Sequence, residues 1–139
     1  MNDPFNLQRF EAAQDAVFEQ VHSELTKGRK RGHWMWFIFP QIKGLGHSVT
    51  ATEFAISSLA EAKAYLQHPV LGPRLRECTQ LVNRVEGRSI LQIFGFPDCL
   101  KFRSSMTLFA HATTKNQVFE DALEKYFDSE PDNLTLERL

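Results

Sequence analysis

The sequence is poor in cysteine, in net charge and in long hydrophobic runs, and each shortage excludes a class of protein. Its two cysteines, Cys78 and Cys99, lack the spacing of a metal site and any secretory context. The formal net charge is −1, so bulk electrostatics favour neither nucleic acid nor a membrane surface as a partner. The longest apolar run, Trp34–Phe39, is far too short to span a bilayer. We therefore expect a reduced, cytoplasmic protein with no membrane segment.

Repeats, low-complexity segments and linkers are also missing, which favours one domain over residues 1–139. A chain of this length can bury a core without disulfides or metal. The composition is 42% hydrophobic and includes twelve phenylalanines, so we expect aromatic rings to fill that core. The N-terminal residues are polar and acidic, and we expect no signal peptide there.

Hydrophobic spacing predicts helices along the whole chain. Between Leu7 and Lys27 the apolar residues recur at helical spacing, with Gln14 and Glu24 outside that stripe. Thr50 and Ser58 each precede a glutamate by three positions, the pattern of a capping box that opens a helix. Further helices are expected at about 73–85, 89–94, 99–112 and 116–127, the helix at 99–112 with Leu100 facing inward. The expected fold class is all-α, a single compact domain of six to eight short helices.

The segment 27–48, KGRKRGHWMWFIFPQIKGLGHS, concentrates the residues expected to carry function. Trp34, Phe37 and Ile38 have helical spacing, although so short a run also fits a buried strand. We favour a helix, because the chain offers no convincing partner strand. The two tryptophans point to different sides of either element, so one can be core while Trp36 lines a cleft. An exposed indole there would stack against a flat ring.

The basic loop Lys27–Arg31 holds four cations in five positions. The ordinary interpretation is a solvated loop that complements the C-terminal end of a helix. The alternative is an anion site in which Arg31 pairs with a phosphate or carboxylate. Four cations in a near-neutral chain are too few to indicate nucleic-acid binding.

The polar loop after the apolar run supplies further candidate ligand-binding residues: Gln41, Gly44, Gly46 and Ser48. Glycines allow the backbone to approach a ligand, and the following helix would present N–H groups to a phosphate. The spacing matches neither a Walker loop nor a dinucleotide-binding fingerprint. His33 and His47 bracket this stretch and are the candidate acid–base residues. None of the five histidines has the spacing of a zinc motif, so no metal site is expected.

A second concentration of polar residues spans 97–107. Lys101, Ser104 and Ser105 fall on one helical face beside Arg103, which indicates either a polar cleft or an exposed surface. A serine–lysine nucleophile would need an oxyanion hole, and the sequence shows none.

Four long motifs resemble one known family. They are HWMWFIFPQ (33–41), GLGHS (44–48), YLQHPVLGPRLREC (65–78) and IFGFPDCLKFRSSMTLF (93–109). The chain resembles the bacterial family known as domain of unknown function 1810, sometimes labelled calpastatin, and departs from it at Gly32, where that family often has serine. The resemblance implies a helical, single-domain protein without an established activity. A more remote likeness is to the NAD- and ADP-ribose-associated (NADAR) proteins, from which no residue can be carried over.

We therefore expect a small binder or enzyme that acts on a phosphorylated, nucleotide-like ligand, with an ADP-ribose-linked compound as one option. Trp36 would stack the base, while Arg31, Lys101 and Arg103 would hold phosphate. No cofactor is expected. The alternative is a non-catalytic interaction module whose basic loop Lys27–Arg31 docks an acidic partner. The sequence leaves open whether the protein is an enzyme and what its oligomeric state is.

Overall fold

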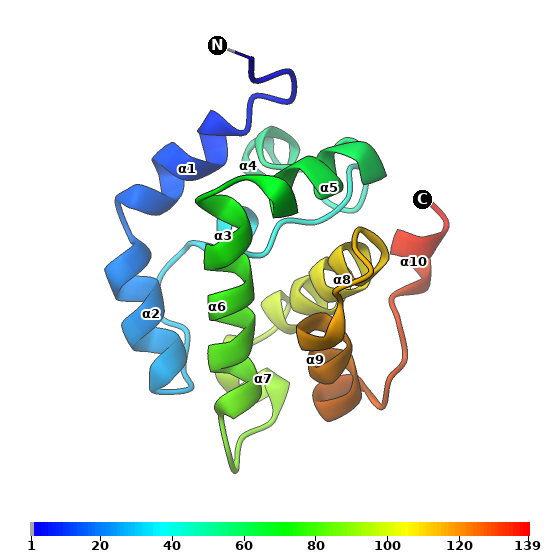
Figure 1. Ribbon diagram of the computed structural model, residues 1–139. Coiled ribbons are helices and arrows are strands. Elements are labelled where there is room, and N and C mark those ends of the chain that lie inside the picture. The colour runs from blue at the N-terminus through cyan, green and yellow to red at the C-terminus, as the bar shows by residue number, and fades with distance from the viewer. Residues whose placement is uncertain (1) are drawn as a thin grey trace.

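The computed structural model describes residues 2–139 as one helical domain (Figure 1). These residues form ten helices: α1 (Gln8–Asp15), α2 (Phe18–Thr26), α3 (Met35–Ile38), α4 (Val49–Glu53), α5 (Leu59–Gln67), α6 (Leu71–Arg84), α7 (Ile90–Phe94), α8 (Asp98–His111), α9 (Gln117–Phe127) and α10 (Asn133–Leu136). The all-α class is confirmed, and the expected number of helices, six to eight, is too low.

The first expected helix is in fact two, and this break raises the count. The chain leaves helical geometry at Val17, where φ is −132° and ψ is 1°. No proline or glycine causes the change of direction. The two halves have different neighbours, since α1 packs on α3 and α2 packs on α6. The tertiary contacts therefore override a continuous helical pattern.

The apolar run is a helix, α3, rather than a strand. Trp34 and Ile38 are buried, whereas Trp36 is only half-buried. Immediately after α3 the chain makes a single parallel bridge between Ile42 and Ile56. This bridge fixes both ends of the 43–55 segment, which contains the glycine loop and α4.

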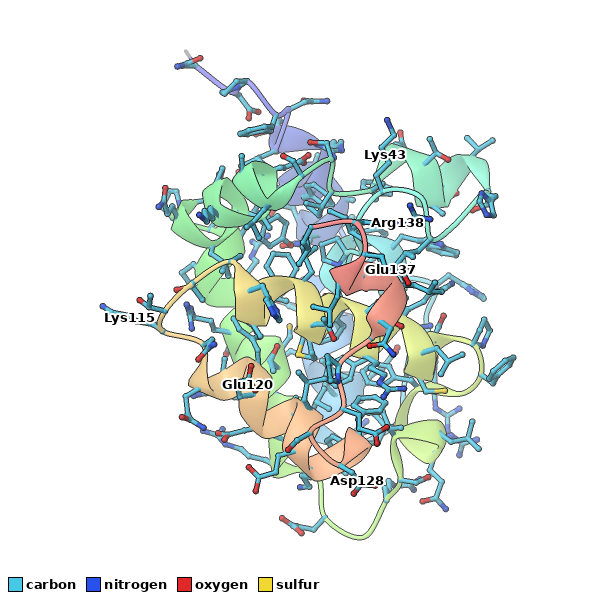
Figure 2. All side chains as sticks on the ribbon, turned by 90° about the vertical axis from the view of Figure 1, so that its right-hand side faces the viewer. Lys43, Lys115, Glu120, Asp128, Glu137 and Arg138 are labelled. Carbon is cyan, nitrogen blue, oxygen red and sulfur yellow. The ribbon has the colours of Figure 1, made fainter. Side chains whose placement is uncertain are left out.

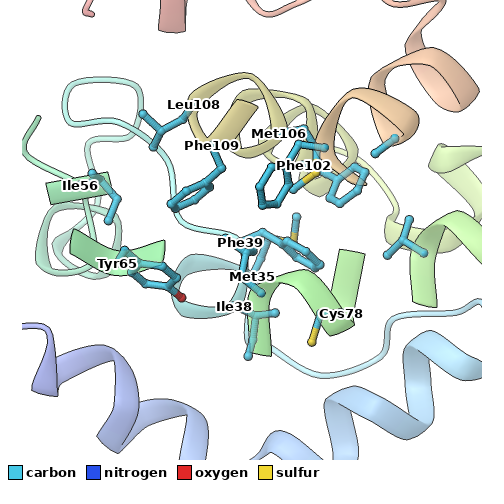
Figure 3. Packing of buried hydrophobic residues seen from close by; sticks show 14 of the residues in the cluster. Met35, Ile38, Phe39, Ile56, Tyr65, Cys78, Phe102, Met106, Leu108 and Phe109 are labelled. Atoms are coloured by element: carbon cyan, nitrogen blue, oxygen red, sulfur yellow. The ribbon is translucent and has the colours of Figure 1, made fainter. Parts of the chain in front are cut away.

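Helix α8 occupies the centre of the domain and contacts α5, α7, α9 and α10. In Figure 1, α1 and α2 lie on one side of α6, and α8, α9 and α10 lie on the other. The rings of Phe39 and Phe102 meet at 5.0 Å with an interplanar angle of 90°, near the middle of the core (Figure 3). Leu100 was expected to face inward, but it is 49% exposed, because the first turn of α8 lies at the surface beside the cavity described below.

Two polar residues outside the predicted apolar stripe are nevertheless buried. Gln14 donates from Nε2 to the carbonyl of Phe37 at 2.8 Å and to the hydroxyl of Tyr65 at 2.9 Å. Glu24 is only 9% exposed and accepts hydrogen bonds from the basic loop. Both side chains are tolerated in the core because their polar atoms are paired.

The C-terminal residues fold back along α8, as Figure 2 shows for α10. Arg138 lies beside the glycine loop and donates from Nη2 to the carbonyl of Gly44 at 3.4 Å. No helix within residues 2–139 has both the length and the apolar character needed to cross a membrane.

Candidate functional site

A cavity of about 510 Å³ opens where the glycine loop, the first half of α8 and the α10 segment meet. Its size falls within the range of roughly 300–1,000 Å³ usual for small-molecule sites. Apolar and polar side chains alternate around it. The lining residues are Trp36, Gln41, Leu45, Gly46, His47, Ser48, Ala51, Pro97, Leu100, Lys101, Arg103, Ser104, Asp132 and Leu134. The two segments singled out in the sequence therefore share one cavity.

Trp36 and Lys101 form one wall. The Nζ of Lys101 lies 5.0 Å from the centroid of the indole ring, a cation–π distance. Lys101 also pairs with Asp98 at 3.3 Å, and the other oxygen of Asp98 lies 2.8 Å from the Nζ of Lys30. One carboxylate thus serves two ammonium groups, so this wall keeps a net positive charge.

Arg103 lies on the next turn of α8 and is held by the segment after α9. Its Nε donates to the carbonyl of Glu130 at 3.0 Å, and its Nη2 lies 3.4 Å from the carboxylate of the same residue. Glu130 is largely exposed, so the ion pair is weak and easily exchanged for another anion. The guanidinium is therefore anchored by a backbone carbonyl but is still able to bind a ligand anion.

Ser104 and Asp132 form an acceptor-rich part of the lining. The hydroxyl of Ser104 donates to Oδ2 of Asp132 at 2.9 Å. The same Oδ2 accepts from the backbone N of Thr135 at 3.2 Å and from its hydroxyl at 2.5 Å. Asp132 is the N-cap of α10, which explains why this short helix forms at all.

The helix after the glycine loop is short and begins earlier than expected. Helix α4 has only five residues, and it starts at Val49 with Ser48 as its N-cap, two residues earlier than the Thr50 pattern predicts. The hydroxyl of Ser48 accepts from the N–H of Ala51 at 3.0 Å, which leaves its own O–H free to donate. Gln41, Gly46 and Ser48 line the cavity as walls. Gly44 lines an adjoining pocket of only about 10 Å³.

The candidate acid–base and anion residues separate in space. His47 lines the cavity, is exposed and has no hydrogen-bond partner among the described residues. His33 and Arg31 are exposed and are not among the lining residues. Ser105 is fully buried in α8, and its hydroxyl has no partner among residues 2–139. Lys101 and Ser104 line the cavity, but Ser105 is not among the lining residues.

The basic loop is shaped by Glu24 rather than by a ligand. Its Oε1 accepts from the backbone N of Arg31 at 2.7 Å, from the N of Gly32 at 2.9 Å and from the indole N–H of Trp34 at 2.9 Å. Burial alone would raise the pKa of this carboxyl. Hydrogen bonds from the Gly32 and Arg31 backbone, and then from Gln20 and Trp34, outweigh it and lower the pKa to about 2.

Three lining residues lie outside both segments that the sequence interpretation singled out: Ala51, Asp132 and Leu134. Asp132 stands directly before Asn133-Leu134-Thr135, and an aspartate followed three positions later by a threonine is a recognisable helix start. Nothing in the sequence indicated that Asp132 lines the cavity, because a contact between residues 104 and 132 depends on the tertiary fold.

Metal and thiol chemistry find no support around the cavity. Within residues 2–139, no group of three or more His, Cys, Asp or Glu side chains is arranged to hold a metal ion. Cys78 is buried, which raises the pKa of its thiol to about 12, and Cys99 is buried as well. Neither cysteine is among the lining residues.

The fold and the cavity define the chain as a small, single-domain helical protein with one amphipathic ligand-sized cleft near its C-terminal helix. The sequence profile described as "Protein of unknown function (DUF1810)" matches residues 4–139, so the chain belongs to this family. The crystal structure of the conserved hypothetical protein Rv1873 from Mycobacterium tuberculosis is 60% identical in sequence. It superposes with a TM-score of 0.98 over 99% of this chain and 98% of that one. A comparison with curated proteins found no match. The expected family is thus confirmed, and the remote NADAR likeness has no support from these comparisons.

Proposed function

We propose that the protein binds a small phosphorylated, nucleotide-like molecule in the cavity. The observation that supports this is the joint presence of Trp36, Lys101 and Arg103 in one cavity with apolar walls. A flat ring would pack against the free part of the indole and against Leu100 and Leu134, which are 49% and 57% exposed. The phosphate would lie between Lys101 and Arg103.

The charges near the cavity favour one phosphate over several. Lys30, Lys101 and Arg103 provide the cations, and Asp98, Glu130 and Asp132 provide as many carboxylates. The charges around the whole cavity are therefore balanced, which disfavours the higher negative charge of a pyrophosphate. A single phosphate can bind beside Lys101, which shares the carboxylate of Asp98 with Lys30, and can displace the exposed Glu130 from Arg103. A nucleoside monophosphate fits this balance better than ADP-ribose or NAD.

Isothermal titration calorimetry with AMP, ADP, ADP-ribose and NAD tests the proposal. We expect AMP to bind most tightly, and we expect Lys101→Met and Trp36→Ala each to weaken its binding about tenfold or more, about 1.4 kcal/mol per factor of ten. Lys115→Ala is the matched control, because Lys115 is an exposed lysine outside the cavity. The absence of heat with all four ligands would disprove the proposal.

His47 is the cavity residue suited to acid–base chemistry on a bound ligand, since it lines the cavity and its ring nitrogens have no hydrogen-bond partner within residues 2–139. We expect His47→Asn to leave AMP affinity within about twofold and to abolish any turnover of a bound nucleotide. Chromatography of reaction mixtures after long incubation checks this. A variant that turns nucleotide over as fast as the unmodified protein would exclude His47 from the chemistry.

The alternative, an interaction module, uses the basic loop Lys27–Arg31. Lys30 is engaged with Asp98, but Lys27, Arg29 and Arg31 remain exposed and lie next to one another in sequence. This proposal predicts a complex with an acidic partner, such as the acidic C-terminal part of another copy, that weakens as salt screens the charges. Size-exclusion chromatography at low and high salt checks it, and a monomer under both conditions with no partner in a pull-down contradicts it.

A further inference from the structure

Asp132 has one carboxylate oxygen fully used and one left free. Three donors from Ser104 and Thr135 converge on Oδ2. The backbone N–H of Asp132 donates to the hydroxyl of Thr107 at 2.9 Å, which fixes the main chain at this position. The side chain is thus held from both ends, and its orientation does not depend on a ligand.

The second oxygen, Oδ1, is not enclosed by the protein. It accepts no hydrogen bond from residues 2–139, and it is not among the enclosed side-chain atoms without a partner, which are Asn83 Oδ1 and Ser105 Oγ. Asp132 is itself a lining residue of the cavity. Ser104, which is 5% exposed and also lines the cavity, points its hydroxyl at Asp132 and keeps a lone pair for a further donor.

An ionised carboxylate accepts hydrogen bonds only, so its partner in the ligand must carry donors. A metal ion would need further acidic ligands, and the described residues do not gather them. A cationic amine would share the cavity with Lys101 and Arg103 and would be repelled by them. Uncharged donors remain. Among them, two neighbouring hydroxyls on a sugar ring can donate to Oδ1 of Asp132 and to the hydroxyl oxygen of Ser104.

We propose that Asp132, supported by Ser104, recognises the neighbouring hydroxyl groups of the ligand's sugar ring. This inference rests on the proposed function and deepens it. Trp36 and the apolar walls select a flat ring, Lys101 and Arg103 select a phosphate, and Asp132 selects the intact ribose between them. Asp132 acts here as a specificity-determining residue.

The experiment compares AMP with dideoxyadenosine monophosphate, which lacks both ring hydroxyls, by calorimetry. The unmodified protein should bind AMP about tenfold or more tightly than the dideoxy compound, the loss expected when donors to a charged acceptor are removed. Asp132→Asn should reduce this preference to about twofold or less. The quantity compared between proteins is the ratio of the two dissociation constants. In this ratio the general effect of removing one negative charge near a phosphate cancels, because both nucleotides carry the phosphate.

Asp128→Asn is the matched control, because it removes the same charge from an exposed position four residues earlier, where φ is 54° and asparagine is well tolerated. It should keep the original preference. Ser104→Ala is a second test, with an intermediate loss of preference, and thermal melting confirms that each variant is folded. Equal binding of both nucleotides by the unmodified protein, or an unchanged preference in Asp132→Asn, overturns the role of Asp132 and leaves the proposed function standing. Failure of both nucleotides to bind overturns the two together.

Discussion

Glu24 is a single side chain that holds the end of the basic loop in place. Its carboxylate accepts from two consecutive backbone N–H groups, at Arg31 and Gly32, and from the indole of Trp34. Without it, these donors would lie partly buried and unpaired. The loop that looked like an anion site is thus filled by an anion from the protein itself.

Glu24→Gln should lower the free energy of unfolding at neutral pH by about 1–3 kcal/mol, because hydrogen bonds to the ionised carboxyl lower its pKa from its ordinary 4.5 to about 2 on folding. A lowered carboxyl pKa stabilises the fold fully above the unfolded value, and this stabilisation is lost as the pH falls through about 2. Urea unfolding between pH 7 and pH 2 checks this, and the two proteins should converge at the acid end. Glu19→Gln, an exposed change on the same helix, should cost less than about 1 kcal/mol. A constant gap across this pH range would contradict the prediction.

The sequence predicted the burial of some of these side chains and not of others. The division between a buried Trp34 and a cavity-lining Trp36 followed from their spacing alone. Gln14 and Glu24 were assigned to the outside because polar side chains are usually exposed. Their burial depends on partners, such as the Phe37 carbonyl and the Trp34 indole, that only the tertiary fold brings near.

At the scale of elements, helices α5 and α6 approach so closely that backbone meets backbone. A Cβ placed on Gly72 would lie 2.1 Å from the carbonyl oxygen of Leu66, far inside contact distance. The first turn of α6 can therefore pack on α5 only with glycine at this position. The HPVLG motif owes its glycine to this contact rather than to flexibility.

Gly72→Ala should destabilise the protein by about 2–3 kcal/mol, because the helices must move apart in a dense interior. Pro73→Ala, at the next and exposed position, should cost less than about 1 kcal/mol. Thermal melting of the two variants side by side measures the difference. Equal melting temperatures would show that α5 and α6 can separate freely.

Helix ends were predictable where a local signal exists. Ser58 caps α5, Ser89 and Gln92 form a capping box on α7, and Gly95 ends α7 at φ 77°. The break between α1 and α2 was not predictable, because no residue near Val17 disfavours a helix. The sequence left open whether the glycine loop and α8 lie side by side, since nothing local in either segment specifies the distance between them.

At the scale of the whole molecule, the two cysteines report on the integrity of the core. Both are buried, and burial raises the pKa of the Cys78 thiol to about 12, so little reactive thiolate forms at neutral pH. A thiol reagent should therefore label neither cysteine in the folded protein and both after unfolding in urea. Labelling by mass spectrometry at increasing urea checks this. Modification of Cys99 alone well below the unfolding transition would show that the start of α8 opens independently.

The unequal burial of the two indoles has a practical consequence for spectroscopy. Trp34 is 1% exposed and should emit at short wavelength whatever occupies the cavity, whereas Trp36 borders the cavity and should respond to an occupant. The native chain thus contains an internal fluorescence reference and a sensor, and no label needs to be attached. Quenching of the red-shifted part of the emission, absent in Trp36→Phe, would allow a library of metabolites to be screened for the natural ligand at micromolar protein concentration.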